Sequence, residues 1–333
     1  MQLVAYGAQD VYLTGNPQIT FFKVVYRRHT NFAVEAIDLT FNGSPAFGSK
    51  SSVQITRNGD LVTQMYLKVT LKENNTAAAT MVRDWGYAII DNVELQIGGT
   101  RIDKHYGHWM HVWSELSRSS EQEQAHTNLV GSGSTSNQTN NSTDGAVITQ
   151  NTSTTTAYVP LQFFCCRNDG LALPLIALQY HDVRLEFNFA SLAEHRIWTA
   201  TGTGLELMNV SLSCNYVYLD SEERKKFAQN SHEYLIEQVQ HQLASNDNER
   251  LNFNHPCKEL IWVEQSTNNV FGSHASNITE ALLKLNGHDR FDKEKTRYFT
   301  DVQILQHHTR RPRCTGNINV YSFALNPEEH QPS

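Results

Sequence analysis

The sequence has few cysteines, no long apolar run and no surplus of positive charge. Its 5 cysteines in 333 residues contain no CxxC spacing, so we expect buried free thiols in a reducing compartment. No stretch approaches about 18 consecutive apolar residues, which excludes an apolar membrane-spanning helix. Residues 1–10 have neither a basic start nor an apolar segment, so we expect no signal peptide. The net charge of -7 argues against a protein that coats a genome directly.

Recognisable catalytic motifs are also missing. The sequence contains no GxxxxGK[ST], GxGxxG or GxSxG pattern, and spacing alone nominates no Ser, His and Asp set. Cys165 falls in an apolar segment, residues 161–166, which we predict to be a strand on which a nucleophile would be hard to reach. We therefore assign no catalytic, cofactor-binding or metal-binding residue and expect no enzymatic activity.

What the sequence does contain is strand-type alternation. Apolar residues alternate with polar ones along residues 65–72, 92–97 and 183–189, and a shorter run covers residues 37–41. Helical spacing is limited to a few places, such as residues 109–116 and 220–229. Short strands separated by polar connections are typical of sandwiches and barrels, and a jelly roll fits this description. The predicted fold class is all-β.

An internal repeat divides the chain into two similar halves. The segment from Leu95 to Lys104 (LQIGGTRIDK) reappears from Leu283 to Lys293 (LKLNGHDRFDK) with one inserted residue. The preceding strand corresponds as well, residues 65–69 against residues 260–263. Two strands and a turn that recur in the same order indicate two copies of one domain.

A polar stretch interrupts the first copy. Residues 131–156 consist mainly of Ser, Thr, Asn and Gly, so we predict a solvated loop that projects from a rigid scaffold. We expect this loop to face the exterior, because an unstructured polar segment is poorly suited to tight packing between copies.

Four segments resemble a known family. Residues 7–33 (GAQDVYLTGNPQITFFKVVYRRHTNFA), 220–227 (DSEERKKF), 232–238 (HEYLIEQ) and 317–325 (NINVYSFAL) are similar to the major capsid proteins of the nucleocytoplasmic large DNA viruses. The resemblance implies a tandem double jelly roll, and it implies that three copies form a homotrimeric, pseudo-hexagonal capsomer that tiles an icosahedral shell. The repeat agrees with this, because two similar domains in each of three chains give six similar sectors.

The resemblance and the repeat together predict the domain organisation. We expect an N-terminal arm at residues 1–30, a first jelly roll at 31–219, a helical connector at 220–231 and a second jelly roll at 232–333. Nothing after residues 318–325 matches the later strands of the first copy. We therefore expect the second jelly roll to be incomplete at its C-terminus and the sequence to be a truncated version of a longer chain; the alternative is a naturally short member whose gap a neighbour fills.

The implied partners are those of a shell protein. We expect copies of the same chain within the trimer and in neighbouring capsomers, together with minor capsid proteins. No direct genome binding is expected, and any contact with an inner viral membrane is expected to be indirect. The implied location is the virion, with assembly in the host cell cytoplasm.

Two clusters suggest other chemistry. His105, His108 and His111 resemble a cupin metal motif at a glance; His105 and His108 would lie on opposite faces of a strand but on one face of a helix. Packing of a half-buried amphipathic turn is the alternative, and we prefer it. A basic group at residues 307–313 contains His307, His308, Arg310, Arg311 and Arg313. It could meet nucleic acid or an acidic partner, but we interpret it as a solvated or intersubunit face.

Three functions therefore stay open at this point. The leading one is a capsid subunit. The second is a minor virion or receptor-binding jelly-roll protein that recognises glycans, suggested by the aromatic content and the polar stretch. The third is a cupin-like metalloenzyme built on the histidines.

Overall fold

The protein is described by a computed structural model. The described residues are 7–9, 12, 30–73, 79–82, 84–131, 144–148, 154–192, 205–244, 246–265, 274–275, 277–312 and 318–330. The predicted N-terminal arm lies almost entirely outside this set. No helix among the described residues is long and apolar enough to cross a membrane.

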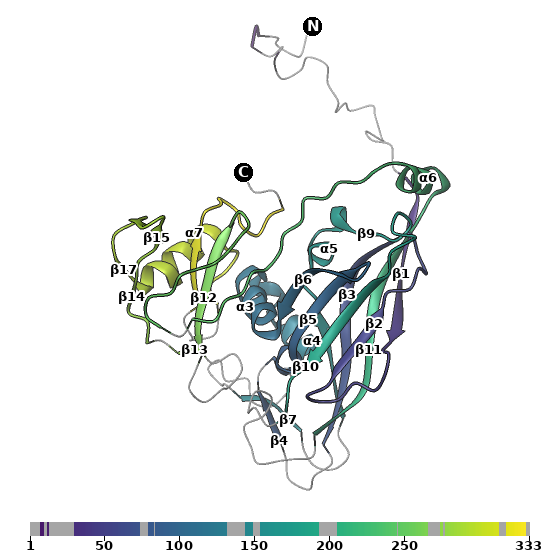
Figure 1. The fold of residues 1–333 in the computed structure, drawn as a ribbon, viewed down its shortest axis with the longest axis horizontal. Helices are drawn as coiled ribbons and strands as arrows, with labels where there is room; N and C mark the ends of the chain where they lie inside the picture. Colours follow the sequence, from purple (N-terminus) through teal and green to yellow (C-terminus); the bar gives the residue numbers. More distant parts are fainter. Residues whose placement is uncertain are drawn as a thin grey trace, which may run out of the picture.

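Residues 32–219 form two antiparallel sheets that share one apolar core (Figure 1). The first sheet has the order β1-β11-β3-β8, with β9 also paired to β3: β1 (Phe32–Thr40), β11 (Leu205–Leu219), β3 (Leu61–Glu73), β8 (Thr154–Pro160) and β9 (Leu173–Pro174). The second sheet has the order β2-β10-β5-β6: β2 (Lys50–Gln54), β10 (Val183–Phe189), β5 (Ile90–Ile97) and β6 (Thr100–Tyr106).

The pairing is nested, which defines a jelly roll. β1 pairs with β11, β2 with β10, β3 with β8, and β5 with β6, so the chain folds back on itself like a rolled-up ribbon. The predicted alternation of apolar and polar residues agrees with which side chains are buried. Along β10, the core contains Val183, Leu185, Phe187 and Phe189, while Arg184 is exposed. We call this part the first sandwich.

The helical segments between the strands of the first sandwich are α2 (Trp85–Ala88), α3 (Gly107–Ser117), η1 (Ser120–Gln122), α4 (Glu123–Val130), α5 (Phe164–Arg167) and η2 (Asp169–Leu171), and α6 (Ser221–Gln229) follows its last strand. The structure confirms the predicted helices at 109–116 and 220–229. The predicted strand at 161–166 is wrong: β8 ends at Pro160, and Cys165 lies on α5.

The polar stretch at 131–156 is only partly a loop. β7 (Asp144–Ile148) lies within it and pairs with β4 (Ala79–Val82), and β8 begins at Thr154. The prediction of one continuous loop is therefore wrong for these residues, since two connections of the jelly roll pair with each other. Residues 132–143 and 149–153 lie outside the described residues.

Residues 259–322 form the second unit, which is smaller. It contains β12 (Glu259–Gln265), β13 (His274–Ala275), β14 (Glu280–Ala281), β15 (Lys284–Leu285), β16 (His288–Asp289), β17 (Glu294–Lys295), the π-helical turn η3 (Tyr298–Val302), α7 (Gln303–His307) and β18 (Ile318–Ser322). β12 pairs with β18 and β13, β14 with β17, and β15 with β16.

The second unit repeats two strand pairs of the first sandwich. β12 pairs antiparallel with β18 as β3 does with β8, and the hairpin β15–β16 corresponds to β5–β6. The two hairpin turns have the same backbone conformation, with positive φ at Gly98 (58°) and Gly99 (80°) and again at Asn286 (53°) and Gly287 (82°). Both hairpins are followed by a helical segment. The chain is thus a tandem double jelly roll.

The second jelly roll is incomplete among the described residues. Among the described residues, no strand follows β18, and residues 230–244 and 246–258 form no strand. In the first sandwich the first two strands, β1 and β2, pair with the last two, β11 and β10. Part of residues 230–244 contacts β6 of the first sandwich instead: Gln238 Nε2 donates to the Ile102 oxygen, and the Val239 backbone N–H donates to Asp103 Oδ1 at 3.1 Å.

Candidate functional site: the joint between the first sandwich and the second unit

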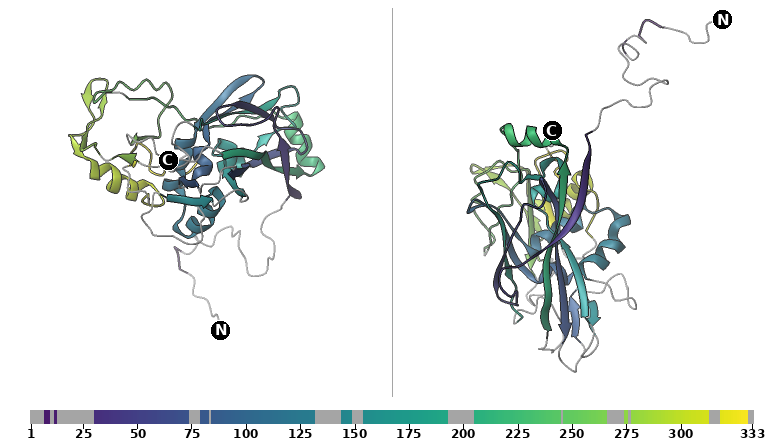
Figure 2. Two further views of the ribbon diagram at one scale, coloured as in Figure 1. Left: turned by 90° about the horizontal axis from the view of Figure 1, so that it is seen from below. Right: turned by 90° about the vertical axis from the view of Figure 1, so that its right-hand side faces the viewer.

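Helix α3 lies between the first sandwich and the second unit (Figures 1 and 2). Val112 and Leu116 on α3 form an apolar cluster with Ile304 of α7 and with Ile318 and Val320 of β18. Val112 and Leu116 lie one helical turn apart, so they share one face of the helix. The cluster buries that face against the second unit, and it is separate from the core of the first sandwich.

The start of α3 is fixed by close packing at Gly107. A Cβ atom there would lie 2.3 Å from the backbone oxygens of both Tyr87 and Ile90. Only glycine allows the chain to leave β6 at this point and turn into the helix. This packing holds α3 against α2 and β5 and directs its far end towards the second unit.

Arg310 of the second unit contacts the C-terminal end of α3. Its Nε donates to the backbone oxygen of Glu115 at 2.9 Å, and its backbone N–H donates to the oxygen of Leu116 at 3.4 Å. The last carbonyl groups of a helix have no partner within the helix and carry partial negative charge. Two of them accept here from Arg310, one from its guanidinium group and one from its backbone N–H, so the same residue joins the two units.

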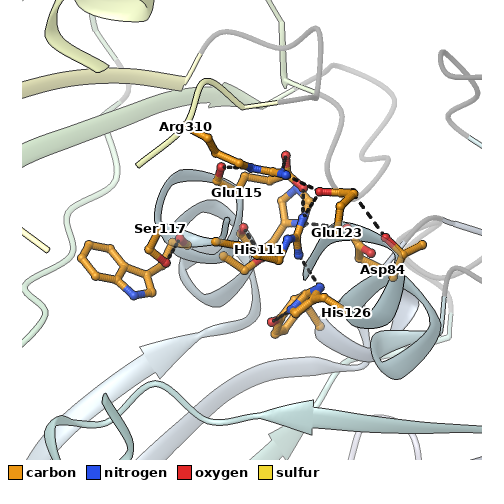
Figure 3. A network of polar contacts seen from close by, with 12 residues as sticks. Asp84, His111, Glu115, Ser117, Glu123, His126 and Arg310 are labelled. Carbon is orange, nitrogen blue, oxygen red and sulfur yellow. Dashed lines mark hydrogen bonds and ion pairs between the residues drawn. The ribbon is translucent and has the colours of Figure 1, made fainter. Parts of the chain in front are cut away.

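Arg310 also belongs to a compact ionic network, which we call the polar joint: Glu115, Arg118, Glu123, His126 and Arg310 (Figure 3). Glu115 is fully buried and accepts from Arg310 Nη2 at 2.9 Å and from Arg118 Nη2 at 3.1 Å. Glu123, in the first turn of α4, accepts from Arg118 Nη2 at 2.9 Å and from Arg310 Nη1. Two carboxylates and two guanidinium groups balance the buried charge.

His126 closes the network on the side of the first sandwich. Arg118 Nη1 donates to His126 Nδ1, which therefore carries no proton, so Nε2 carries it and faces the Tyr87 hydroxyl at 3.0 Å. Burial, reinforced by the Arg118 charge, lowers the pKa of His126 to about 4. The ring is thus neutral near pH 7, and it serves as a hydrogen-bond acceptor for Arg118.

This arrangement suits mechanical connection better than chemistry. The carboxylates are neutralised by direct ion pairs, and the network is packed between helices. Removing one partner of a buried ion pair leaves an uncompensated charge, which typically costs about 3–5 kcal/mol. The polar joint therefore fixes how the second unit sits on the first sandwich, and it disfavours other arrangements.

Comparison with known proteins assigns the family. The family described as "Major capsid protein N-terminus" matches residues 20–220, and the family described as "Large eukaryotic DNA virus major capsid protein" matches residues 223–333. The major capsid protein of Pyramimonas orientalis virus is 48% identical over an alignment that covers 100% of this chain and 87% of the relative. The chain belongs to the family of large eukaryotic DNA virus major capsid proteins.

Further relatives agree with this membership. The major capsid protein of Paramecium bursaria Chlorella virus 1 is 39% identical, with 100% of this chain and 82% of the relative covered. A chain of the PBCV-1 capsid, in a quasi-atomic model, superimposes with a TM-score of 0.75 at 34% identity, covering 94% of this chain and 83% of that one. The Faustovirus major capsid protein shares the fold, with a TM-score of 0.69 at 11% identity and coverage of 98% and 88%.

The function follows from the family. This capsid protein is a structural component of a viral shell, it is located in the virion capsid, and it is not an enzyme. The comparisons do not support the alternative of a minor or receptor-binding protein that recognises glycans.

Among the described residues of this capsid protein, no group of three or more His, Cys, Asp or Glu side chains is arranged to hold a metal ion. β6 ends at Tyr106 and α3 begins at Gly107, so His105 lies on a strand and His108 on a helix. Neither the all-strand nor the all-helix interpretation was right. His105 Nε2 lies 2.8 Å from Asp103 Oδ2, and its ring stacks on Phe163. His111 Nδ1 lies 3.4 Å from Asp84 Oδ2.

The basic group at 307–313 is not simply a solvated face. Arg310 enters the polar joint, and Arg311 Nε pairs with Asp301 at 2.9 Å. His308 is buried between Glu259 (3.1 Å) and Glu328 (2.8 Å); burial alone would lower its pKa, but these two carboxylates raise it to about 9. Arg313 lies outside the described residues.

The cysteine prediction holds in part. Cys165 and Cys214 are buried free thiols, Cys166 is half-buried, Cys257 is exposed, and Cys314 lies outside the described residues. Cys257 lies just before the start of β12, in a stretch of mostly exposed residues, which the sequence pattern did not predict.

Sequence reasoning missed most of the polar joint. Arg310 was noted only as one of several basic residues, and Arg118, Glu123 and His126 were not noted at all. One signal was present: Glu115 and Arg118 are three residues apart at the end of a predicted helix, which is the spacing of a helical ion pair. That spacing says nothing of Arg310, because the partner comes from a distant part of the chain.

Proposed function

We propose that three copies of this chain form a pseudo-hexagonal capsomer that tiles an icosahedral shell. The observation that carries the proposal is the recurrence of the strand pairs of one jelly roll in the second unit, including the same φ-positive hairpin turn. Two similar units in each of three chains give six similar sectors around one axis. A block of sixfold outline can pave a surface although only three copies build it.

The polar joint supports this proposal. A tile must keep its outline when neighbours press on it, so its two halves have to be fixed relative to each other. The buried ion pairs of Glu115 and the apolar cluster on α3 fix them within a single chain. A preassembled pair of sectors then has to form only one further kind of contact, between copies, to complete the ring.

We also propose the division of the chain that the sequence predicts: an arm at 1–30, a first jelly roll at 31–219, a connector at 220–231 and a second jelly roll at 232–333. Helix α6 supports the connector, since it begins at an Asp220 N-cap and has no buried residue. Minor capsid proteins as partners and assembly in the host cell cytoplasm belong to the same proposal, on the strength of the family resemblance.

Mass photometry and sedimentation velocity of the purified chain test the proposal. We expect a species of three times the chain mass, and negatively stained images of it should have a six-sided outline. A chain that stays monomeric at tens of micromolar, or that forms dimers, would contradict the trimer. A subsequent map of assembled particles would show whether the blocks tile an icosahedral lattice.

A further inference from the structure

Two adjacent cysteines on α5 bring their thiols together in the first sandwich. The Sγ atoms of Cys165 and Cys166 lie 3.9 Å apart. On a strand, adjacent side chains would point to opposite faces of the sheet, so the helical turn is what places the two sulfur atoms close to each other. Both thiols are free; Cys165 is buried in the core and Cys166 is half-buried. One thiol of the pair is therefore partly accessible to solvent, and its neighbour is not.

The buried thiol is held in its protonated form. The contact with Cys166 raises the pKa of Cys165, and burial raises it further. Because the thiolate is the reactive form of cysteine, Cys165 is not the thiol that an oxidant attacks first. Cys166 is the point of attack, and Cys165 is the resolving thiol beside it. Redox-sensitive cysteines often combine these two features, an accessible sulfur and a resolving sulfur next to it.

Arg167, the next residue on α5, connects this helical turn to the rest of the chain. Its Nη2 pairs with Glu237 Oε2 at 3.1 Å, and its guanidinium carbon lies 5.0 Å from the ring centre of Trp113 on α3. Glu237 lies on the segment that joins α6 to β12, and it also pairs with Lys258, just before β12, at 2.5 Å. A change in the geometry of α5 would thus reach the segment that leads into the second unit.

We propose that Cys165 and Cys166 form a reversible disulfide when a peroxide oxidises them, and that this disulfide releases Arg167 from Glu237. Adjacent Cα atoms lie about 3.8 Å apart, whereas disulfides usually join Cα atoms about 4.4–6.8 Å apart. A disulfide between neighbours is therefore strained, so α5 has to rearrange to form it, and a strained disulfide is readily reduced again. All of these contacts lie within one chain, so the inference does not depend on the proposed trimer.

The reaction is a two-electron oxidation. Hydrogen peroxide converts the Cys166 thiol to a sulfenic acid and releases one water. The Cys165 sulfur then attacks the Cys166 sulfur, the S–O bond breaks, and the hydroxyl group leaves as a second water with the proton of the Cys165 thiol. The two thiols lose two electrons and two protons, and the peroxide takes up both. A dithiol reductant reverses the step and is itself oxidised to a disulfide, so the pair follows the redox state of its compartment.

Peptide mapping of the purified chain tests the disulfide. After treatment with hydrogen peroxide, we expect the peptide that contains both cysteines to lose the mass of two hydrogen atoms, and dithiothreitol should restore it. Cys166→Ser should prevent this loss, because only one thiol of the pair remains. Cys257→Ser is the matched control, since it removes an exposed thiol elsewhere and should leave the loss unchanged. An unmodified pair, sulfinic acids in place of a disulfide, a disulfide to a different cysteine, or a bond that dithiothreitol does not reduce would overturn the proposal.

Hydrogen exchange of residues 230–244 tests the link to α5. The Val239 N–H donates to Asp103 Oδ1 at 3.1 Å, so its exchange reports whether this segment stays on β6. We expect exchange in the segment to be at least about 5-fold faster in the oxidised chain, with no change in the core strand β10. Reduced Arg167→Ala should show the same increase, and oxidation should add nothing further in that variant. A disulfide without faster exchange in this segment, or faster exchange that includes β10 or also occurs in peroxide-treated Cys166→Ser, would overturn the release of Arg167.

Discussion

Arg310 Nε donates a 2.9 Å hydrogen bond to the backbone oxygen of Glu115, a residue 195 positions earlier in the chain. The same guanidinium reaches the Glu115 carboxylate through Nη2 at 2.9 Å. One side chain thus satisfies a helix end and a buried carboxylate, and it does so across the boundary between the first sandwich and the second unit. This contact forms only when the two units pack against each other, so their packing is part of the folding of the chain.

Replacement of Arg310 should therefore destabilise the whole chain. Arg310→Ala removes one of the two guanidinium groups that pair with the buried Glu115 carboxylate, so we expect a loss of about 3–5 kcal/mol in the free energy of unfolding. Urea denaturation followed by fluorescence measures it. Arg310→Lys keeps the positive charge but lacks the planar guanidinium that donates to several oxygens at once. This variant should therefore recover only part of the lost stability. Arg311→Ala, at an exposed ion pair, should cost less than about 1 kcal/mol; equal losses at both positions would contradict the role given to Arg310.

A double-mutant cycle should show that Glu115 and Arg310 are coupled. Glu115→Gln and Arg310→Met each remove one charge and leave the other partner short of an ion pair. We expect the double variant to lose less stability than the sum of the two single variants, with a coupling energy of about 1–3 kcal/mol. Additive losses within about 0.5 kcal/mol would show that the two side chains act independently. The measurement is urea denaturation of all four chains under one set of conditions.

His126 should make the chain sensitive to acid. Its pKa falls from an ordinary 6.5 to about 4 in the folded state, so the unfolded chain binds a proton more readily than the folded one. Stability should therefore drop as the pH falls from about 6.5 to about 4, by as much as about 2–3 kcal/mol from this group. In His126→Gln, a neutral amide can still accept from Arg118 and donate to Tyr87. We expect this variant to have a flatter stability profile between pH 7 and pH 4.5; an unchanged profile would contradict the assignment.

His308 should make the chain sensitive to alkali. Glu259 and Glu328 raise the folded-state pKa of His308 to about 9, so the folded chain holds this proton more tightly than the unfolded one. Its contribution should be complete below about pH 6.5 and should disappear as the pH rises through about 9. We expect His308→Gln to lower the unfolding midpoint at pH 6 and to remove most of the decline between pH 7 and pH 9.5. The acid limb of the profile should not change in this variant, and a loss there would argue against separate roles for the two histidines.

Strand positions and the tandem repeat could be read from the sequence because they depend on local patterns. The alternation of Val183, Leu185, Phe187 and Phe189 matches β10 from end to end. The turn signals Gly98-Gly99 and Asn286-Gly287 correspond to two hairpins of the same geometry. Failures occurred where pairing between distant segments decided the outcome, as for β7 in the polar stretch, which pairs with β4.

The sequence by itself determined an all-β chain with one plan used twice, since side-chain period and turn chemistry act within a few residues. It also determined the family, because the resembling segments are spread along the chain. Only the tertiary structure decided that Glu115 is buried and pairs with Arg310, that His308 is buried between Glu259 and Glu328, and that Leu305 is exposed. The reason is physical: whether a charge is solvated or paired depends on which distant surface folds over it, and no local pattern records that.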